Sequence, residues 1–366
     1  MSYPTFSVTV NTDKCPDRER EALLADPGFG QVFTDHMVTI NWNKDLGWHD
    51  AQLRPQAPFS IHPANVVLHY GQEIFEGMKA YRRDDGAVNL FRPDDNAKRL
   101  NASAARMTLP ELPEALFLES IYRLIDIDRD WVPQGECSLY VRPFMFANDI
   151  ALGVQPPNSC IFCVIASPAG AYYSASKPLS VWVTDRYARA ADGGTGAAKC
   201  GGNYAGGLIA QAEAYEKGCD QVIFLDAAEH RWIEELGNMN VFFVMDDGSI
   251  ITPRLGTILS GITRLSIIDL AQSEGHQVTE TQYSFDEWAA DAATGRLREV
   301  FACGTAATVV GVSEVRSDSH QFTISDGQTG PVTNRLRSRL LDIQRGNAED
   351  PFGWCKTVPT QACEVA

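Results

Sequence analysis

The sequence predicts an α+β (mixed α/β) protein built from two domains. The chain has 366 residues, which is long for a single hydrophobic core. Strand-length apolar runs and helical stretches follow one another without strict alternation, which favours two mixed sheets over a regular βαβ series. Small residues, Pro and Gly at 167–177 interrupt every periodicity and predict a linker between a smaller α/β domain at 1–166 and a larger domain at 178–366.

The composition argues against several classes of partner. The net charge is −16, whereas binding to nucleic-acid phosphates needs a basic surface, so no nucleic-acid partner is expected. The longest apolar runs have the length of strands rather than of membrane spans, and the N-terminus lacks the basic and apolar regions of a signal peptide. No membrane association is therefore expected. Nine cysteines without framework spacing fit free thiols in a reducing cytoplasm.

The first domain is expected to contain short strands and two helices. The first helix is predicted to start at Asp94 or Asp95 as its N-cap. Cys160 and Cys163 form a lone C-x-x-C inside an apolar run, which favours a place in the core over redox chemistry. The predicted strands are 37–42, 66–69, 87–91, 138–146 and 160–166, and the predicted helices are 94–107 and 113–128.

The second domain opens with a strand and then becomes glycine-rich before a helix that Gly218 is expected to end. Asp246, Asp247 and Gly248 are typical of a hairpin turn. The predicted strands are 179–184, 221–226, 232–235, 240–245 and 299–302, and the predicted helices are 204–217, 263–274 and 285–294.

Lys199, in the segment 198–204 (AKCGGNY), is the first candidate for chemistry. Small neighbours leave the lysine open to a planar ring, and burial would lower its pKa and free the amine as a nucleophile. Such an amine can form a Schiff base with an aldehyde cofactor. Taken alone, an exposed lysine in an ordinary glycine-rich turn is the commoner interpretation.

Two further segments support the same hypothesis. Glu234 and Glu235 end a predicted strand, and a carboxylate there could keep a pyridine nitrogen protonated, although a solvated acidic pair is the simpler interpretation. The segment 259–265 (LSGITRL) opens a helix, and Thr263 as its cap would leave backbone N–H groups for a phosphate. A similar turn follows at 303–307. No zinc motif, nucleophile elbow or P-loop is present, and no metal is expected.

The spacing of these segments resembles a known family. The segment 235–242 (ELGNMNVF), then Thr252, then 259–264 (LSGITR) match the pattern of class IV aminotransferases. Over almost the whole chain the sequence resembles branched-chain aminotransferases of fold-type IV, which are enzymes that use pyridoxal 5′-phosphate. The segments that carry this resemblance are 33–37 (FTDHM), 68–71 (LHYG), 75–80 (FEGMKA), 90–93 (LFRP), 140–143 (YVRP), 199–204 (KCGGNY) and 304–306 (GTA).

The resemblance implies roles for individual residues around the cofactor. Lys199 forms the internal aldimine and, once released, moves the proton between Cα and C4′. Tyr204 hydrogen-bonds the phenolic oxygen, Glu235 pairs with the pyridine nitrogen, and Arg99 contacts the phosphate. The full set of cofactor-binding residues implied by the resemblance is Arg99, Lys199, Tyr204, Glu235, Asn238, Leu259, Gly261, Ile262, Thr263, Gly304 and Thr305.

The resemblance also implies the substrate and the assembly. The activity is that of a branched-chain-amino-acid transaminase, which passes the amino group of L-Leu, L-Ile or L-Val to 2-oxoglutarate in two half-reactions, and the protein is a homodimer. Two alternatives remain: another fold-type IV enzyme, such as a D-amino acid aminotransferase or aminodeoxychorismate lyase, and a non-catalytic pyridoxal-phosphate-binding protein. The substrate groups implied are Tyr70, Arg142, Thr305 and Ala306 for the α-carboxylate, and Phe29, Phe75, Tyr140 and Tyr172 for the apolar side chain.

Overall fold

The computed structural model describes residues 3–170, 172–173 and 177–360. These residues form two compact units, and each has its own sheet, as the predicted mixed α/β class requires. Unit 1 contains the described residues of 1–172, 198–201 and 343–366, and unit 2 those of 173–197 and 202–342. The domain boundaries at 166 and 178 stay a prediction. Strand β8 (Ser159–Ala169) runs three residues into the predicted linker, and linker residues 171 and 174–176 lie outside the described residues.

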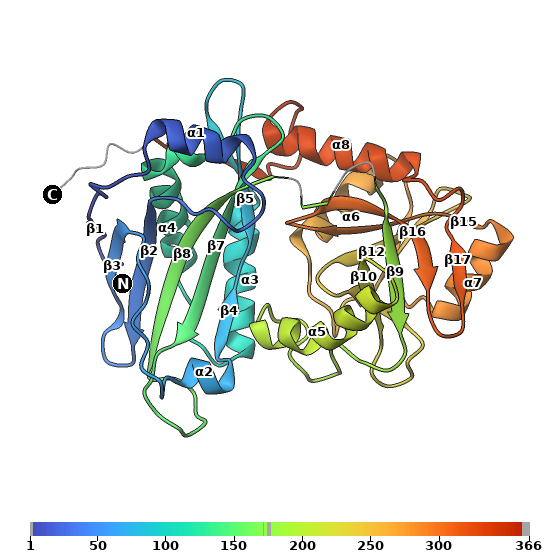
Figure 1. The fold of residues 1–366 in the computed structure, drawn as a ribbon, viewed down its shortest axis with the longest axis horizontal. Helices are drawn as coiled ribbons and strands as arrows, with labels where there is room; N and C mark the ends of the chain where they lie inside the picture. The colour runs from blue at the N-terminus through green and yellow to red at the C-terminus, as the bar shows by residue number, and fades with distance from the viewer. Residues whose placement is uncertain (1–2, 171, 174–176, 361–366) are drawn as a thin grey trace. The chain divides into compact units, whose positions relative to one another are not determined.

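Unit 1 is organised around a mostly antiparallel sheet (Figure 1), whose neighbouring strands are joined by hairpins such as β2–β3, β5–β6 and β7–β8. In sheet order its strands are β1 (Ser7–Val8), β3 (Gly47–Pro55), β2 (His36–Asn43), β8, β7 (Ser138–Ala147), β5 (Met78–Arg82), β6 (Val88–Phe91) and β18 (Cys355–Thr357), with β4 (Glu73–Phe75) beside β7. Its helices are α1 (Asp17–Ala25), α2 (Val66–Tyr70), α3 (Pro93–Arg106), α4 (Glu114–Ile127) and the 3-10 turn η1 (Arg129–Trp131).

Helix α4 covers one face of this sheet. Its buried residues recur at helical spacing, which directs one apolar stripe toward β2, β3 and β8. Phe117 of α4 lies 6.0 Å from Phe162 of β8, measured between ring centroids. Cys160 and Cys163 are buried in the same unit, and burial raises the pKa of the Cys160 thiol to about 12. Both cysteines are therefore core residues, as predicted.

Helix α2 corrects the sequence prediction, which placed a strand at 66–69. The side chain of Asn65 accepts a hydrogen bond from the N–H of Val67, which caps the first turn. Gly71 adopts a left-handed conformation with φ 56° and donates its N–H to the carbonyl of Val67, which ends the helix after five residues. The two caps override the strand preference of the paired valines.

Helix α3 also starts differently from the prediction. Its N-cap is Arg92, in the left-handed region at φ 49°, and Pro93 occupies the first helical position. Asp94 and Asp95, predicted as caps, lie in the first turn instead, where negative side chains are favoured by the helix dipole.

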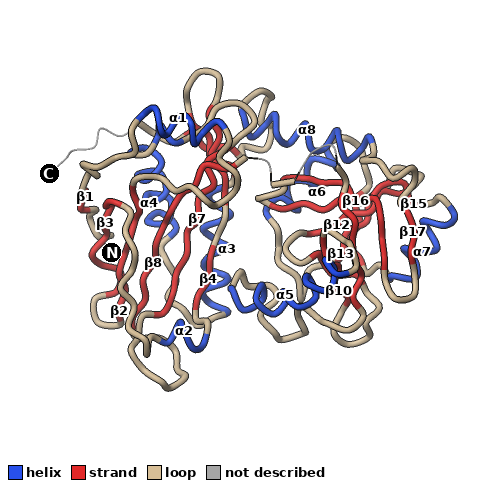
Figure 2. The backbone as a smooth tube through the Cα atoms, viewed as in Figure 1, coloured by secondary structure: helices blue, strands red, loops and turns tan. Residues whose placement is uncertain are grey.

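Unit 2 contains a second mixed sheet with helices beside it (Figure 2). The hairpin predicted at 246–248 joins β12 to β13, and Gly248 has φ 81°. Helix α7 has the predicted bounds because Ser284 and Glu287 form a capping box and Gly295 ends it in the left-handed region. In sheet order the strands are β11 (Ile233–Leu236), β10 (Gln221–Leu225), β9 (Leu179–Thr184), β16 (Thr308–Arg316), β15 (Leu297–Gly304), β12 (Asn240–Met245), β13 (Ile250–Pro253) and β14 (Val278–Thr281), with β17 (Gln321–Thr323) beside β16. The remaining helices are α5 (Gly201–Glu216), α6 (Ile262–Ser273), α7 (Phe285–Thr294) and α8 (Pro331–Arg345). Among the described residues, none of the helices has the length and apolar character needed to cross a bilayer.

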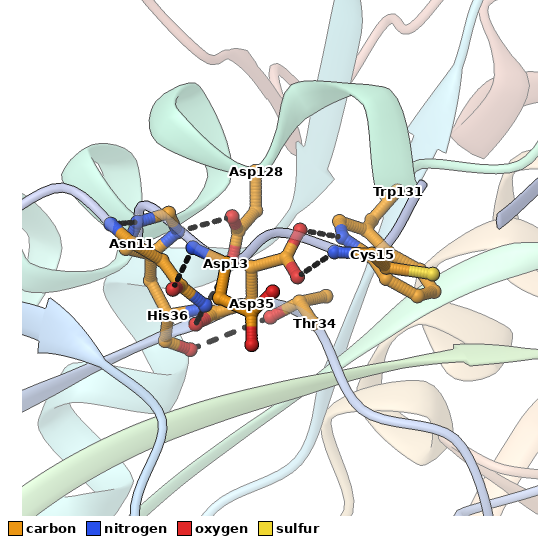
Figure 3. A network of polar contacts seen from close by, with 8 residues as sticks. All are labelled: Asn11, Asp13, Cys15, Thr34, Asp35, His36, Asp128 and Trp131. Carbon is orange, nitrogen blue, oxygen red and sulfur yellow. Dashed lines mark hydrogen bonds and ion pairs between the residues drawn. The ribbon is translucent and has the colours of Figure 1, made fainter. Parts of the chain in front are cut away.

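A buried polar network fastens the N-terminal segment of unit 1 to β2 (Figure 3). The backbone N–H of Asn11 donates to Nε2 of His36 at 2.9 Å, so this nitrogen must carry a lone pair. The proton of the neutral ring therefore sits on Nδ1, which donates to Asp128 at 2.6 Å. Asp128 also accepts the backbone N–H of His36, and Asp35 accepts from Trp131 and from the N–H of Cys15.

Replacing Asp128 tests how much this network stabilises the fold. Asp128→Ala leaves two buried donors of His36 without an acceptor, so the free energy of unfolding should fall by roughly 3 kcal/mol in urea titrations. Asp130→Ala, at a side chain that is 81% exposed, is the matched control and should change stability by less than about 0.5 kcal/mol. Equal small losses in the two variants would contradict the role of the network.

Candidate active site

The peptide around Lys199 is bound to unit 1 by three hydrogen bonds. The N–H of Lys199 donates to Oγ of Ser103 at 2.9 Å, and the N–H of Phe75 donates to the carbonyl of Lys199 at 3.0 Å. The N–H of Gly201 donates to Oε1 of Glu73. The flanking side chains of Ala198 and Cys200 are buried in the core of unit 1. This segment therefore has one defined position on β4 and α3.

The amine of Lys199 lies in a desolvated, aromatic environment. Its Nζ is 4.7 Å from the centroid of the Phe75 ring. Burial, followed by the nearby positive charge of Arg99, lowers the pKa of Lys199 from 10.5 to about 8, while Glu76 acts in the opposite direction. The exposed-turn interpretation of this lysine is thus excluded. The lowered pKa favours the neutral amine, which is the nucleophilic form.

Arg99 is fixed by a buried carboxylate that the sequence analysis did not single out. Nε and Nη2 of Arg99 donate to the two oxygens of Glu76, each at 2.8 Å, and the Glu76 side chain is fully buried. Such a bidentate pair sets the plane of the guanidinium. Glu76 also accepts the N–H of Gly77.

The aromatic residues predicted for the substrate pocket form one cluster in unit 1. The ring of Phe29 contacts Tyr140 at 5.1 Å and Tyr172 at 4.8 Å, both in edge-to-face geometry. Arg142 lies over the rings of Phe75 and Tyr140, at 4.8 and 5.3 Å from their centroids, and donates to the Tyr140 hydroxyl. The structure thus brings an arginine, an aromatic wall and, through Phe75, the lysine amine together.

Tyr70 contacts another segment of unit 1, the loop that contains Leu152. It is the last residue of α2, its side chain is exposed, and its hydroxyl donates to the carbonyl of Leu152. The role in binding the α-carboxylate expected for Tyr70 therefore stays a prediction.

In unit 2, Glu235 is buried rather than solvated. It lies on β11 and forms an ion pair with Arg189 at 2.6 Å, with side chains only 3% and 2% exposed. The adjacent Glu234 is also buried, and its carboxylate accepts a hydrogen bond from Thr257. Because neighbouring side chains of a strand point to opposite faces, Glu234 and Glu235 lie on opposite faces of β11. Arg189 was missed because no sequence motif surrounds it.

Three loops of unit 2 that were predicted to bind the cofactor lie side by side. Helix α6 begins at Ile262 with Gly261 as its N-cap, so Thr263, predicted as the cap, lies in the first turn. Nδ2 of Asn240 donates to the carbonyl of Leu259, and a Cβ at Gly261 would overlap the Asn240 side chain. Close packing therefore requires glycine before α6.

The turn between β15 and β16 adjoins the same region. A Cβ at Gly304 would lie 3.4 Å from Met239 and 3.6 Å from the carbonyl of Asn238, and β15 pairs with β12 along its length. Thr305 and Ala306 follow Gly304 and are half-buried, whereas Asn238 is exposed. Tyr204 is half-buried in the first turn of α5.

Comparison with known proteins identifies the family. The family described as amino-transferase class IV matches residues 73–315. A probable branched-chain-amino-acid aminotransferase of Streptomyces coelicolor is 53% identical over 362 residues, which cover 98% of this chain and 100% of the relative. The crystal structure of the Escherichia coli branched-chain amino acid aminotransferase is 29% identical with a TM-score of 0.74, and the alignment covers 89% of this chain and 99% of the other.

A further solved structure of similar fold carries a ligand. It is a branched-chain amino acid aminotransferase of T.th., complexed with N-(5′-phosphopyridoxyl)-L-glutamate. It is 29% identical to this chain with a TM-score of 0.72, and the alignment covers 87% of this chain and 98% of the other.

The fold and the matched region are those of a class IV aminotransferase. Within this class, the chain belongs to the branched-chain-amino-acid aminotransferase family. The expected fold class and transaminase activity are thereby confirmed.

The lowered pKa of Lys199 predicts its pH-dependent reactivity. Acylation of Lys199 by acetic anhydride in the full-length, cofactor-free protein should rise with pH, with a midpoint at about 8 and a plateau above about pH 9, because only the neutral amine reacts. Glu76→Gln removes a negative charge that raises this pKa, so its midpoint should lie lower. Peptide mass spectrometry measures the rates, with the exposed Lys98 as internal reference. A midpoint near 10.4, as for an ordinary lysine, would contradict the environment described.

Proposed function

We propose that this enzyme transfers the amino group of L-leucine, L-isoleucine and L-valine to 2-oxoglutarate, with pyridoxal 5′-phosphate as its cofactor. The observation that carries the proposal is the Lys199 amine, with a pKa lowered to about 8 and an aromatic ring at 4.7 Å. A neutral lysine amine beside a planar, apolar surface is the group that an aldehyde cofactor requires.

The donor groups of each unit fit this cofactor. In unit 2, the first N–H groups of α6, with Thr263 and Thr305, suit a phosphate because a helix N-terminus attracts anions. We assign Glu235, which is buried beside Arg189, to the pyridine nitrogen, on which a carboxylate can hold a proton. In unit 1, we assign Arg99, whose guanidinium plane is set by Glu76, to the phosphate as well.

Different residues of the chain then have different roles in the reaction. When bound, pyridoxal phosphate supplies a ring that accepts electrons from the substrate Cα. Lys199 takes the proton from Cα and returns it to C4′, and Tyr204 donates its phenol hydrogen to the ring oxygen. Leu259, Gly261, Ile262 and Gly304 would hold the phosphate through their backbones, and Asn238 would lie beside the ring.

The substrate is bound by charge at one end and by apolar contact at the other. We assign Arg142 to the carboxylates, together with the turn at Thr305 and Ala306. The wall formed by Phe29, Phe75, Tyr140 and Tyr172 accepts branched aliphatic side chains. A methylene difference in an apolar pocket changes binding by only about 1–3 kcal/mol, so all three branched amino acids should be substrates.

A homodimer is proposed from an exposed apolar surface of unit 1. Helix α2 and the segment 148–155 are joined by the hydrogen bond from Tyr70 to Leu152 and by a bridge between Asn65 and Ile150. An apolar patch of this kind on a protein surface marks an interaction site, and its tyrosine fits a role in the active site of the neighbouring subunit. The residues of this α2 patch, with their exposed fractions, are Leu68 (59%), Tyr70 (38%), Ile150 (64%), Leu152 (73%) and Val154 (74%).

The location proposed is the cytoplasm. Every cysteine among the described residues is a free thiol, which suits a reducing compartment.

The activity is tested by the absorbance of the cofactor-loaded protein. L-leucine should bleach the yellow band, and 2-oxoglutarate should restore it. In Lys199→Ala neither change should occur, because this variant lacks the proton-transferring amine. Lys98→Ala, at an exposed lysine, is the control and should behave as the unmodified protein. If D-alanine but not L-leucine bleaches the band, the substrate assignment is overturned. If the protein shows no band after pyridoxal 5′-phosphate is added, the proposal as a whole is overturned.

The dimer is tested by placing a charge in the α2 patch. Leu152→Asp should shift the protein from dimer to monomer in analytical ultracentrifugation, because a buried unpaired carboxylate opposes association. Leu46→Asp changes a similarly exposed leucine, 69% exposed in the β2–β3 turn, and should leave the mass unchanged. A dimer that survives Leu152→Asp at low micromolar concentration would contradict this interface.

A further inference from the structure

Glu73 occupies a distinctive place in the segment that bears the lysine. Of the three hydrogen bonds that hold this segment, two use the backbone of Phe75 and the hydroxyl of Ser103, and the third uses the Glu73 carboxylate. The Glu73 side chain is half-buried on β4. It is therefore the only ionisable group among these three anchors in the described chain.

The geometry of β4 links Glu73 to the amine itself. Residues two apart on a strand point to the same face, so Glu73 and Phe75 act on one side of β4. Glu73 binds the peptide two residues after Lys199, while the Phe75 ring lies 4.7 Å from the lysine Nζ. Glu73 thus fixes the backbone next to Lys199, and the Phe75 ring contacts the lysine amine.

The Glu73 carboxylate and the backbone of Gly201 lie very close together. A Cβ at Gly201 would overlap the Glu73 carboxylate, whereas a Cβ at the next residue, Gly202, would meet nothing within 4 Å. Glycine at 201 is therefore needed for the contact, and glycine at 202 is not. Burial raises the pKa of Glu73, and the Gly201 N–H and Arg142 counteract this by favouring the charged form.

We propose that Glu73 is a positioning residue for the reaction: by accepting the Gly201 N–H, it fixes the Lys199 peptide so that the amine is aimed at the cofactor aldehyde. The proposal rests on the proposed function. In this role Glu73 contacts neither the substrate nor the cofactor. It affects the step in which the Lys199 amine captures the cofactor aldehyde, whereas other residues bind the phosphate and the ring.

Two cofactor forms distinguish these steps. Pyridoxal 5′-phosphate has an aldehyde that the Lys199 amine captures with loss of water, and the visible band reports the rate of capture. Pyridoxamine 5′-phosphate has an amine in that place and cannot be captured, so its affinity reports binding alone. In Glu73→Ala, capture should be roughly tenfold slower or more, since small misplacements of a reacting group cost up to about a hundredfold. The affinity for pyridoxamine 5′-phosphate should be unchanged.

Further variants make the test specific. Glu73→Gln keeps an oxygen that accepts the Gly201 N–H and should restore most of the capture rate. Gly201→Ala should reproduce the slow capture from the other side of the contact, and Gly202→Ala, the matched control in the same helix turn, should not. Because Gly201→Ala leaves Glu73 in place, this pair keeps the proposal testable if Glu73→Ala fails to fold.

The outcomes separate the two proposals. If the unmodified protein binds neither cofactor form, the proposed function falls. If it binds both, but Glu73→Ala captures pyridoxal 5′-phosphate at the unmodified rate, or loses affinity for both forms equally, only the positioning role of Glu73 is overturned. Equal slowing in Glu73→Gln and Glu73→Ala would likewise overturn it.

Discussion

The proposed active site depends on keeping one lysine both desolvated and fixed in position. A buried ammonium is unfavourable, so Lys199 is pushed toward its neutral form, and a flexible side chain needs an anchored backbone before its amine can be aimed. Unit 1 supplies the anchor through Ser103, Phe75 and Glu73. These contacts place a short segment, 198–201, within unit 1, although the chain on both sides of it belongs to unit 2.

Buried charge pairs set the electrostatics around this arrangement. Arg99 with Glu76 in unit 1 and Arg189 with Glu235 in unit 2 are each closed by contacts of 2.8 Å or less. Burying such pairs costs desolvation energy, which only good geometry offsets. One pair orients the Arg99 guanidinium near the lysine, and the other places Arg189 against Glu235, the carboxylate that we propose for the pyridine nitrogen.

The sequence predicted best those features whose cause is local. The bounds of α7 follow from Ser284 and Glu287 three residues apart, and the β12–β13 hairpin follows from Gly248. Lys199 and Glu235 were singled out as candidates because their neighbours form recognisable segments. Helix α2 was missed because two weak local signals, Asn65 and Gly71, outweighed a valine-rich run that favours strand.

Features created by contacts between distant parts of the chain could not be predicted from local sequence patterns. The anchor of Lys199 at Ser103 spans 96 residues, and that of Gly201 at Glu73 spans 128. No periodicity or motif connects positions so far apart. The same holds for Arg189, a loop residue whose partner lies on β11, and for the His36–Asp128 pair, separated by 92 residues.

Amide hydrogen exchange measures whether unit 1 holds the lysine segment, because the hydrogen bonds that anchor this segment use backbone N–H groups. In the full-length protein, the amides of Phe75, Lys199 and Gly201 should exchange as slowly as those in the middle of β7 and β8. Exchange as fast as at the exposed residues Asp84 and Asp85, between β5 and β6, would show that unit 1 does not hold the lysine segment.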